Sequence, residues 1–216
     1  MASSGHGLEG KSRMSVSWKN RGAVALVRID SPPVNAVGEA VREGLLKALE
    51  ATEADDTVRA VVLTCAGRTF IAGADIREFD KPLVPPMLPD VLARLEKARK
   101  PWVAAIHGTA LGGGLETALA CSQRIAARDA RMGLPEVTLG LIPGAGGTVR
   151  LPRLVDPAFA LKMITGGKPV GAEQALAEGL IDALSNTDLL GDAVSLALRA
   201  AALPRPVPLA QRAPVV

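Results

Sequence analysis

Two glutamates stand where acid–base chemistry could be carried out. Glu116 follows the run Gly112–Gly114, in the first turn of a helix expected through residue 120. Glu136 follows Leu134 and Pro135 at the end of a short expected strand. Two carboxylates in one polar pocket can act as base and acid when their surroundings separate their pKa values, a combination suited to adding water across a conjugated double bond. Taken singly, each could equally be a surface glutamate.

The segment 107–117 contains the first of two glycine clusters. A strand ends, three glycines follow and a helix begins, so the first helical N–H groups have no intrahelical partner and point outward at the positive end of the helix dipole. This arrangement suits a developing oxyanion. The spacing is not that of a dinucleotide fingerprint, and no Lys-Ser/Thr pair closes a phosphate loop. The same glycines could instead serve only close packing.

A second loop of small residues follows the strand expected at 58–64. Ala72, Gly73 and Ala74 lie in the segment 68–77, at the carboxyl end of that strand, where ligands bind in open α/β sheets. If the two strands are neighbours, the two loops can each offer one N–H to a single carbonyl oxygen.

Strand-like and helix-like segments alternate along the first half of the chain, which predicts βαβ crossovers and a largely parallel sheet in an α/β fold. A hairpin turn is expected at 20–22, and a second glycine cluster, 143–147, leads into a helix that carries Arg150. The expected strands are 16–19, 23–29, 58–64, 102–106, 124–127 and 131–133, and the other expected helices are 38–54, 89–100, 158–165, 172–178 and 189–201.

Composition limits the classes of protein to consider. The 216 residues fit one domain, and no apolar run approaches the ~20 residues needed to cross a bilayer. Two cysteines, Cys65 and Cys121, are too few for a disulfide framework and are expected to be buried apolar residues. With two histidines and no cysteine cluster, no metal site is expected. The net charge of +3 is ordinary, and no basic-aromatic pattern supports nucleic-acid binding.

Both ends of the chain differ from the middle. Residues 1–13 are polar and rich in Gly and Ser, and we interpret them as an added leader outside the fold. Residues 204–216 are rich in proline, which excludes a regular helix or central strand and indicates a linker or a truncated C-terminal segment. The domain is therefore expected at 14–203.

Four segments together resemble the crotonase, or enoyl-CoA hydratase/isomerase, family, and the similarity runs from about residue 18 to residue 182. They are SPPVNAVGEAVREGL (31–45), FIAGADIREF (70–79), HGTALGGGLETALAC (107–121) and RMGLPEVTLGLIPGAGGTVRLPRL (131–154). The resemblance implies a crotonase-like spiral of ββα units.

The resemblance also implies roles for individual residues. Glu116 and Glu136 would be catalytic, and the N–H groups of Ala74 and Gly113 would form an oxyanion hole for the thioester oxygen. Coenzyme A would lie along the loop that begins after Ile71. The residues expected to bind it are Ala72, Gly73, Ala74, Asp75, Ile76, Arg77, Gly112 and Gly113.

Two departures from the family pattern bear on the wider protein. The connection between Phe79 and Trp102 is short and looks like the amino-terminal part of a multifunctional β-oxidation enzyme, in which a 3-hydroxyacyl-CoA dehydrogenase domain follows. Further helices are expected in the family beyond Pro204, so the C-terminal helical part is expected to be truncated.

The retained glutamate pair favours an enoyl-CoA hydratase, which forms 3-hydroxyacyl-CoA from 2-enoyl-CoA in fatty acid β-oxidation. The alternatives are a Δ3,Δ2-enoyl-CoA isomerase, both activities in one site, or a non-catalytic CoA-binding or assembly module. The acyl-CoA is the substrate, and no cofactor, metal, nucleic acid or membrane partner is expected. The expected location is cytoplasmic, or peroxisomal in a eukaryote, and a homo-oligomer stays an open alternative.

Overall fold

A six-stranded sheet forms the framework of the molecule. Its strands are β1 (Val16–Arg21), β2 (Val24–Ile29), β3 (Ala60–Cys65), β4 (Trp102–Ile106), β6 (Gln123–Ala127) and β9 (Ala183–Ser185), in the spatial order β1-β2-β3-β4-β6-β9. Only the β1–β2 hairpin is antiparallel, so the predicted parallel sheet is confirmed. The computed structural model describes residues 14–78, 81–82 and 84–215, and the expected leader lies outside them.

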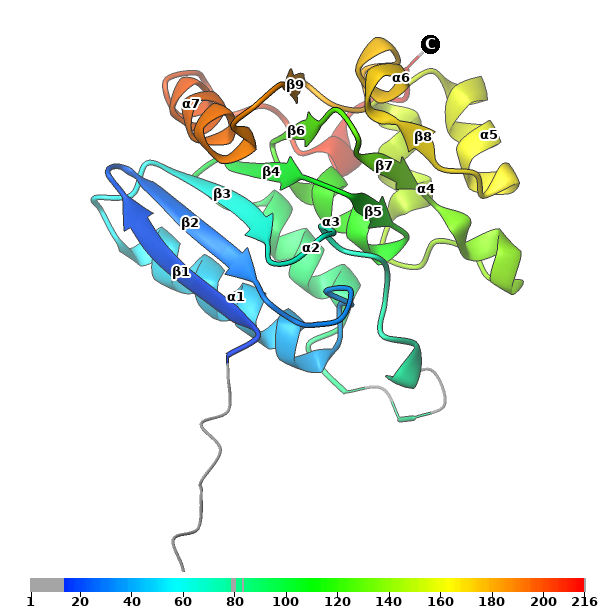
Figure 1. Ribbon diagram of the computed structural model, residues 1–216, viewed down its shortest axis with the longest axis horizontal. Coiled ribbons are helices and arrows are strands. Elements are labelled where there is room, and N and C mark those ends of the chain that lie inside the picture. Colours follow the sequence, from blue (N-terminus) through cyan, green and yellow to red (C-terminus); the bar gives the residue numbers. More distant parts are fainter. Residues whose placement is uncertain (1–13, 79–80, 83, 216) are drawn as a thin grey trace, which may run out of the picture.

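A smaller sheet stands beside the first (Figure 1). It contains β5 (Thr109–Leu111), β7 (Arg131–Gly133) and β8 (Val170–Gly171). In the pairs β4–β5 and β6–β7, the first strand lies in the large sheet and the second in the small one, which is the expected repetition of ββα units. The strands β5, β8 and β9 are missing from the sequence-based assignment, because each has only two or three residues, too few for an alternating pattern; β7 is as short but was predicted.

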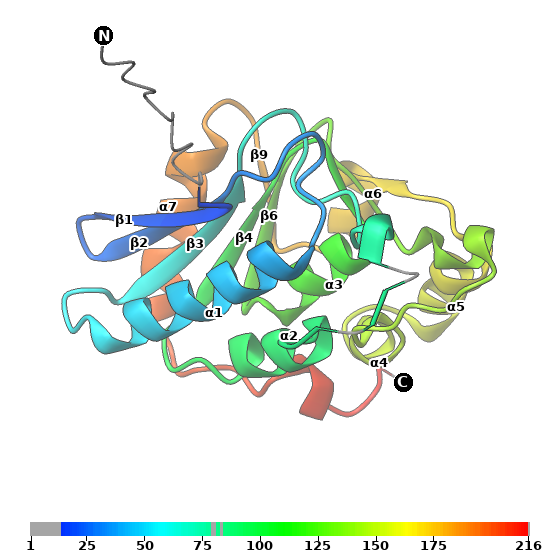
Figure 2. The same cartoon turned by 90° about the horizontal axis from the view of Figure 1, so that it is seen from below.

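Helices cover both faces of the large sheet. Figures 1 and 2 show the helices α1 (Glu39–Ala54), α2 (Leu88–Glu96) and α3 (Gly113–Ala120) on one face, and α7 (Leu189–Ala201) on the other. The remaining helices are α4 (Gly147–Arg150), α5 (Pro157–Gly166) and α6 (Ala172–Ala177), with short 3-10 turns η1 (Ile76–Glu78), η2 (Pro135–Leu139), η3 (Leu151–Arg153) and η4 (Leu209–Gln211).

The inner strands β2, β3 and β4 are apolar on both sides because both faces of the sheet are buried there, whereas the edge strand β1 is mostly exposed. In β3, Val61 and Leu63 face the large core shared with α1, α2 and α3, whereas Val62 faces a smaller core beneath α7. The two predicted buried cysteines are indeed buried. The sheet therefore separates two apolar compartments, and the segments with chemical interest all lie on the α3 side.

Helix α2 ends earlier than predicted, at Glu96 instead of residue 100. The backbone N–H groups of Arg99 and Lys100 donate to the carboxylate of Glu53, at 3.1 and 3.0 Å. These bonds to α1 replace the last helical bonds, and no local sequence pattern reveals such a partner more than forty residues away.

The proline-rich segment after α7 folds back onto the domain. Leu209 in η4 is buried, and the N–H of Val215 donates to the carbonyl of Pro152 at 3.2 Å. The assignment of residues 204–216 as a linker or truncated segment stays a prediction, but within this chain the segment is packed against α2 and η3.

A buried asparagine joins the turn after β2 to the loop after β3. Asn35 adopts φ 55°, and its side-chain amide donates to the carbonyls of Ala66 and Thr69 at 2.8 and 2.9 Å. Its Oδ1 accepts the N–H of Ser31 at 2.9 Å. Asparagine tolerates this left-handed conformation better than most residues. The side chain thereby fixes the start of the loop that leads to Ala74.

We expect Asn35→Ala to lower the free energy of unfolding by about 2–4 kcal/mol, because it leaves buried carbonyls unpaired in a conformation that alanine disfavours. Urea denaturation measures the change. Asn20→Ala, which removes one exposed hydrogen bond to Asp55, is the matched control and should change stability by about 0.5 kcal/mol or less. Equal losses in the two variants would contradict the structural role of Asn35.

Candidate active site

The first glycine cluster forms the start of α3. Gly112 is the N-cap, with φ 52° and ψ −124°, and its N–H donates to the carbonyl of Gly133 at 2.9 Å. A Cβ atom on Gly112 would lie 2.9 Å from Oε1 of Glu136. Both the positive φ and the contact require glycine at this position. Gly113 is the first residue of the helix, so its N–H has no intrahelical partner.

The loop after β3 lies directly against this helix start. Ile71 donates to the carbonyl of Thr109 at 3.1 Å and accepts the N–H of Leu111 at 3.0 Å. Beyond it, Ala74 forms a bridge with Val37. A Cβ atom on Gly113 would lie 3.6 Å from the backbone nitrogen of Ala74, so the two predicted oxyanion residues are neighbours.

The N–H groups of Ala74 and Gly113 donate to no acceptor within the described part of the chain. Two neighbouring amides without internal partners can bind one carbonyl oxygen that develops negative charge. The two N–H groups come from separate segments: Ala74 lies in the loop after β3, and Gly113 follows β5.

Glu116 is buried, with 2% of its surface exposed. Its Oε1 accepts the N–H groups of Ala145 and Gly147, at 2.8 and 2.7 Å. Burial raises the pKa of Glu116, while these two hydrogen bonds and the charge of Arg150 act in the opposite direction. The alternative of a surface glutamate is therefore wrong for this residue.

Glu136 lies in η2 rather than at the end of a strand, since β7 ends at Gly133. It is half-buried, and its Oε2 is buried without a hydrogen-bond partner in the described structure. Burial raises the pKa of Glu136, its own N–H lowers it, and the negative charge of Glu116 raises it. Compared with an ordinary glutamate, this carboxyl group is therefore shifted toward its protonated form, as Glu116 also is.

The second glycine cluster belongs to the same site. The turn at residues 145–147 supplies both N–H donors to Glu116, and Arg150 in α4 donates to the carbonyl of Ala145 at 2.8 Å. From the sequence, this cluster was predicted only to lead into a helix that carries Arg150. Its signal was available, because a glycine run before a helix is the same pattern that identified the first loop.

The predicted CoA-binding residues do not all present free groups. The N–H of Ala72 donates to Val34 and the carbonyl of Gly73 accepts from Val37, so both are engaged in holding the loop. Asp75 and Arg77 form an ion pair with N···O 2.6 Å in which the arginine is exposed. The backbone of Ile76 begins η1, and its side chain lies outside the described part.

A cavity of about 540 Å³ opens beside Ala74. It is mainly apolar and lies between the loop after β3, the start of α2 and the loop after η2. Its apolar lining includes Val37, Ala74, Val84, Met87, Leu88 and Leu141. An extended apolar chain attached to a carbonyl at Ala74 and Gly113 would find room here.

Among residues 14–78, 81–82 and 84–215, no group of three or more His, Cys, Asp or Glu side chains is arranged to hold a metal ion. Within the same ranges, no helix combines the length and apolar character required to cross a membrane.

Comparison with known proteins gives the site a family. The model of the enoyl-CoA hydratase/isomerase family matches residues 19–209. This chain belongs to that family. It is 48% identical over 182 residues to the peroxisomal bifunctional enzyme of Danio rerio. The aligned residues make up 84% of this chain and 25% of that enzyme. It is 47% identical over 165 residues to a probable enoyl-CoA hydratase of Bacillus subtilis, covering 73% of this chain and 64% of the relative.

Solved structures agree with this assignment. The enoyl-CoA hydratase of Bacillus anthracis aligns with a TM-score of 0.82 and 34% identity, over 88% of this chain and 78% of that one. The predicted crotonase-like fold is thereby confirmed. The chain nevertheless spans only a quarter of the length of the bifunctional enzyme and about two thirds of the Bacillus subtilis relative.

The two glutamates should titrate as neighbours. We expect Glu116→Gln to lower the pKa of Glu136, because the substitution removes the negative charge that raises it. Titration of ¹³C-labelled glutamate carboxyl groups by NMR, with the Glu136 signal assigned from Glu136→Gln, measures the shift. Glu173→Gln, in an exposed ion pair on α6, is the control and should leave the Glu136 titration unchanged. An unaltered Glu136 titration in Glu116→Gln would show that the carboxyl groups are not coupled.

Proposed function

We propose that this chain is an enoyl-CoA hydratase that adds water across the double bond of a 2-enoyl-CoA. One observation carries the proposal: two carboxyl groups with different hydrogen bonding converge beside two unpaired backbone N–H groups. Family membership supports it, as does the retention of both glutamates.

The thioester oxygen would accept the N–H groups of Ala74 and Gly113. Negative charge that moves onto this oxygen makes C3 of the enoyl group electrophilic, and the amides stabilise that charge most strongly in the transition state. The cavity beside Ala74 would take the apolar part of the substrate. The loop that carries Asp75, Ile76 and Arg77 would contact coenzyme A.

The two carboxyl groups would divide the proton transfers. Burial raises the pKa of Glu116 and so makes its carboxylate a stronger base, while the two N–H donors and Arg150 oppose that rise. This carboxylate removes a proton from water as the water oxygen bonds to C3. Glu136, biased toward its protonated form, gives a proton to C2. A proton then passes between the carboxyl groups to restore the starting state. The reaction as written draws on no cofactor.

A second activity, Δ3,Δ2-enoyl-CoA isomerase, is favoured by one observation. Oε2 of Glu136 is buried and has no partner among the described residues, so this oxygen is free to move a proton between C2 and C4 of a bound 3-enoyl-CoA. This reaction needs the oxyanion amides and Glu136 but no activated water. Formation of the conjugated thioester band from a 3-enoyl-CoA would detect it.

The setting of this activity is also a proposal. The relatives named peroxisomal bifunctional enzyme suggest that the chain serves as the hydratase part of a longer fatty acid β-oxidation enzyme, with a 3-hydroxyacyl-CoA dehydrogenase domain following. A peroxisomal location in a eukaryote, or a cytoplasmic one in a bacterium, would fit that setting. Association into a homo-oligomer is compatible with it.

Glu136→Gln should slow hydration of crotonyl-CoA by several orders of magnitude while acyl-CoA affinity stays nearly unchanged, because the amide cannot deliver a proton. Loss of absorbance at the enoyl thioester band measures the rate, and Glu173→Gln, exposed on α6, is the control. Near-normal turnover in Glu136→Gln would refute the acid role. Binding without any turnover in the unaltered chain would favour the non-catalytic CoA-binding module instead.

Gly113→Pro removes one proposed oxyanion N–H at the first position of α3, a position that proline tolerates. The side chain of Leu88, 3.1 Å from a Cβ at this site, has to move slightly. We expect hydration to fall about 10²- to 10³-fold. Far-UV circular dichroism confirms that the variant is folded, and a folded variant with turnover within tenfold of the original would contradict the assignment of Gly113.

A further inference from the structure

Arg150 is linked to Glu116 through a single residue of the second glycine cluster. The carbonyl of Ala145 accepts a hydrogen bond from Nη1 of Arg150 at 2.8 Å, and the N–H of Ala145 donates to Oε1 of Glu116 at 2.8 Å. The guanidinium also lies where a Cβ of Gly146 would be. The position of Arg150 therefore determines where the donors of Glu116 can lie.

Arg150 is itself held by Glu96 at the end of α2. Its Nε and Nη2 donate to Oε2 of Glu96 at 3.2 and 3.0 Å. The two side chains are only 6% and 8% exposed. Breaking a buried ion pair of this kind is costly, because the remaining charge stays buried without its counter-charge.

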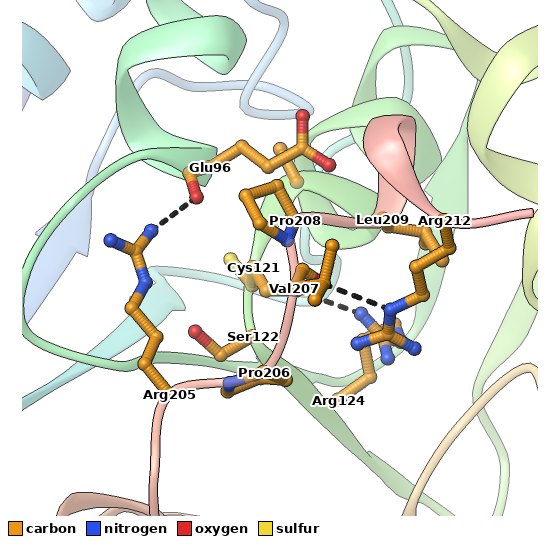
Figure 3. Close-up of a pocket in the computed structure, with 11 residues that line it drawn as sticks. Glu96, Cys121, Ser122, Arg124, Arg205, Pro206, Val207, Pro208, Leu209 and Arg212 are labelled. Atoms are coloured by element: carbon orange, nitrogen blue, oxygen red, sulfur yellow. Dashed lines mark hydrogen bonds between the residues drawn. The ribbon is translucent and has the colours of Figure 1, made fainter.

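The chain after α7 completes this pair. Oε1 of Glu96 accepts the N–H of Ala210 at 2.7 Å, and Leu209 packs beside it with 5% of its surface exposed. Figure 3 shows Arg205 reaching the backbone carbonyl of Glu96, and Pro208 and Leu209 line the same pocket as Glu96. Arg205 also donates to the carbonyl of Lys97 at 2.8 Å.

We propose that Glu96 and Arg150 are positioning residues for the catalytic carboxylate of Glu116, and that residues 205–210 complete this arrangement by closing over Glu96. Neither residue touches the substrate in the proposed reaction. They act through the turn at 145–147, which they hold against Glu116. The inference rests on the proposed function only in calling Glu116 catalytic.

Charge contributes as well as geometry. Arg150 faces Glu116 from α4 and favours its ionised form, whereas Glu136 faces the site from η2 as a like charge. Without the positive charge of Arg150, the pKa of Glu116 rises. A smaller fraction of Glu116 is then ionised at a given pH, so the acidic limb of the kcat/KM profile moves to higher pH.

Arg150→Met tests the pair directly. We expect kcat for crotonyl-CoA hydration to fall about 100-fold with KM changed by less than about threefold, since misplacement of a catalytic group acts on the chemical step. The acidic limb should move to higher pH. Arg150→Lys, which keeps the charge but not the two-nitrogen contact with Glu96, should restore the position of the limb and only part of kcat. Arg128→Met, in an exposed pair with Glu173, is the control.

Leu209→Ala tests the contribution of the C-terminal segment without changing a backbone donor. We expect kcat to fall about three- to tenfold with KM unchanged, because loosening the segment weakens the contact of Ala210 with Glu96. Leu203→Ala, just before this segment and 65% exposed, is the matched control and should not change kcat. Equal kcat in the two variants would overturn the role of the segment.

A titration separates this inference from the proposed function. In ¹³C-labelled protein, the pKa of Glu116, assigned from Glu116→Gln, should rise in Arg150→Met and stay unchanged in Arg128→Met. If the unaltered chain fails to hydrate crotonyl-CoA, the proposed function is wrong, and this titration alone decides the positioning role. An unchanged Glu116 titration in Arg150→Met would overturn it, as would a loss of kcat no greater than in Arg128→Met.

Discussion

The close approach of two backbones supports the rest of the site. A Cβ atom on Gly114 would collide with the carbonyl of Ile71, so only glycine lets α3 start this close to the loop after β3. The same loop is bonded to β5 on both sides of Ile71. Because the two segments touch through main-chain atoms, the N–H groups of Ala74 and Gly113 are placed by hydrogen bonds of the backbone and not by adaptable side chains.

Burying a carboxylate is unfavourable unless its hydrogen bonds are made within the protein. Glu116 satisfies this requirement with two N–H donors from one turn, and the nearby Arg150 supplies an opposite charge. Glu136 has no comparable set of donors, and one of its oxygens lacks any partner in the described structure. Burial raises the pKa of both carboxyl groups, so the contrast between them is a difference of hydrogen bonding, and the proposed division of the proton transfers rests on it.

Sequence patterns predicted the parallel sheet, most helices and the residues Ala74, Gly113, Glu116 and Glu136, which the structure brings together. These predictions depend on local features: apolar periodicity, glycine runs and the motifs of the family. The link from Glu96 through Arg150 to Ala145 depends on contacts between residues 54 and 5 positions apart. The periodicity of apolar residues along the chain does not reveal such contacts, and a single Glu or Arg in a helix looks in the sequence like any solvent-exposed residue.

The large sheet divides the apolar core into two compartments, and the candidate site lies on the side of only one of them. Val62 of β3 and Leu196 of α7 belong to the smaller core between the sheet and α7, whereas Leu115 of α3, next to Glu116, belongs to the larger core on the other face. We expect substitutions in the smaller core to change stability alone, while those around α3 also disturb the proposed site. The α7 side of the sheet is therefore the place to alter the protein when the arrangement of the two glutamates has to be kept.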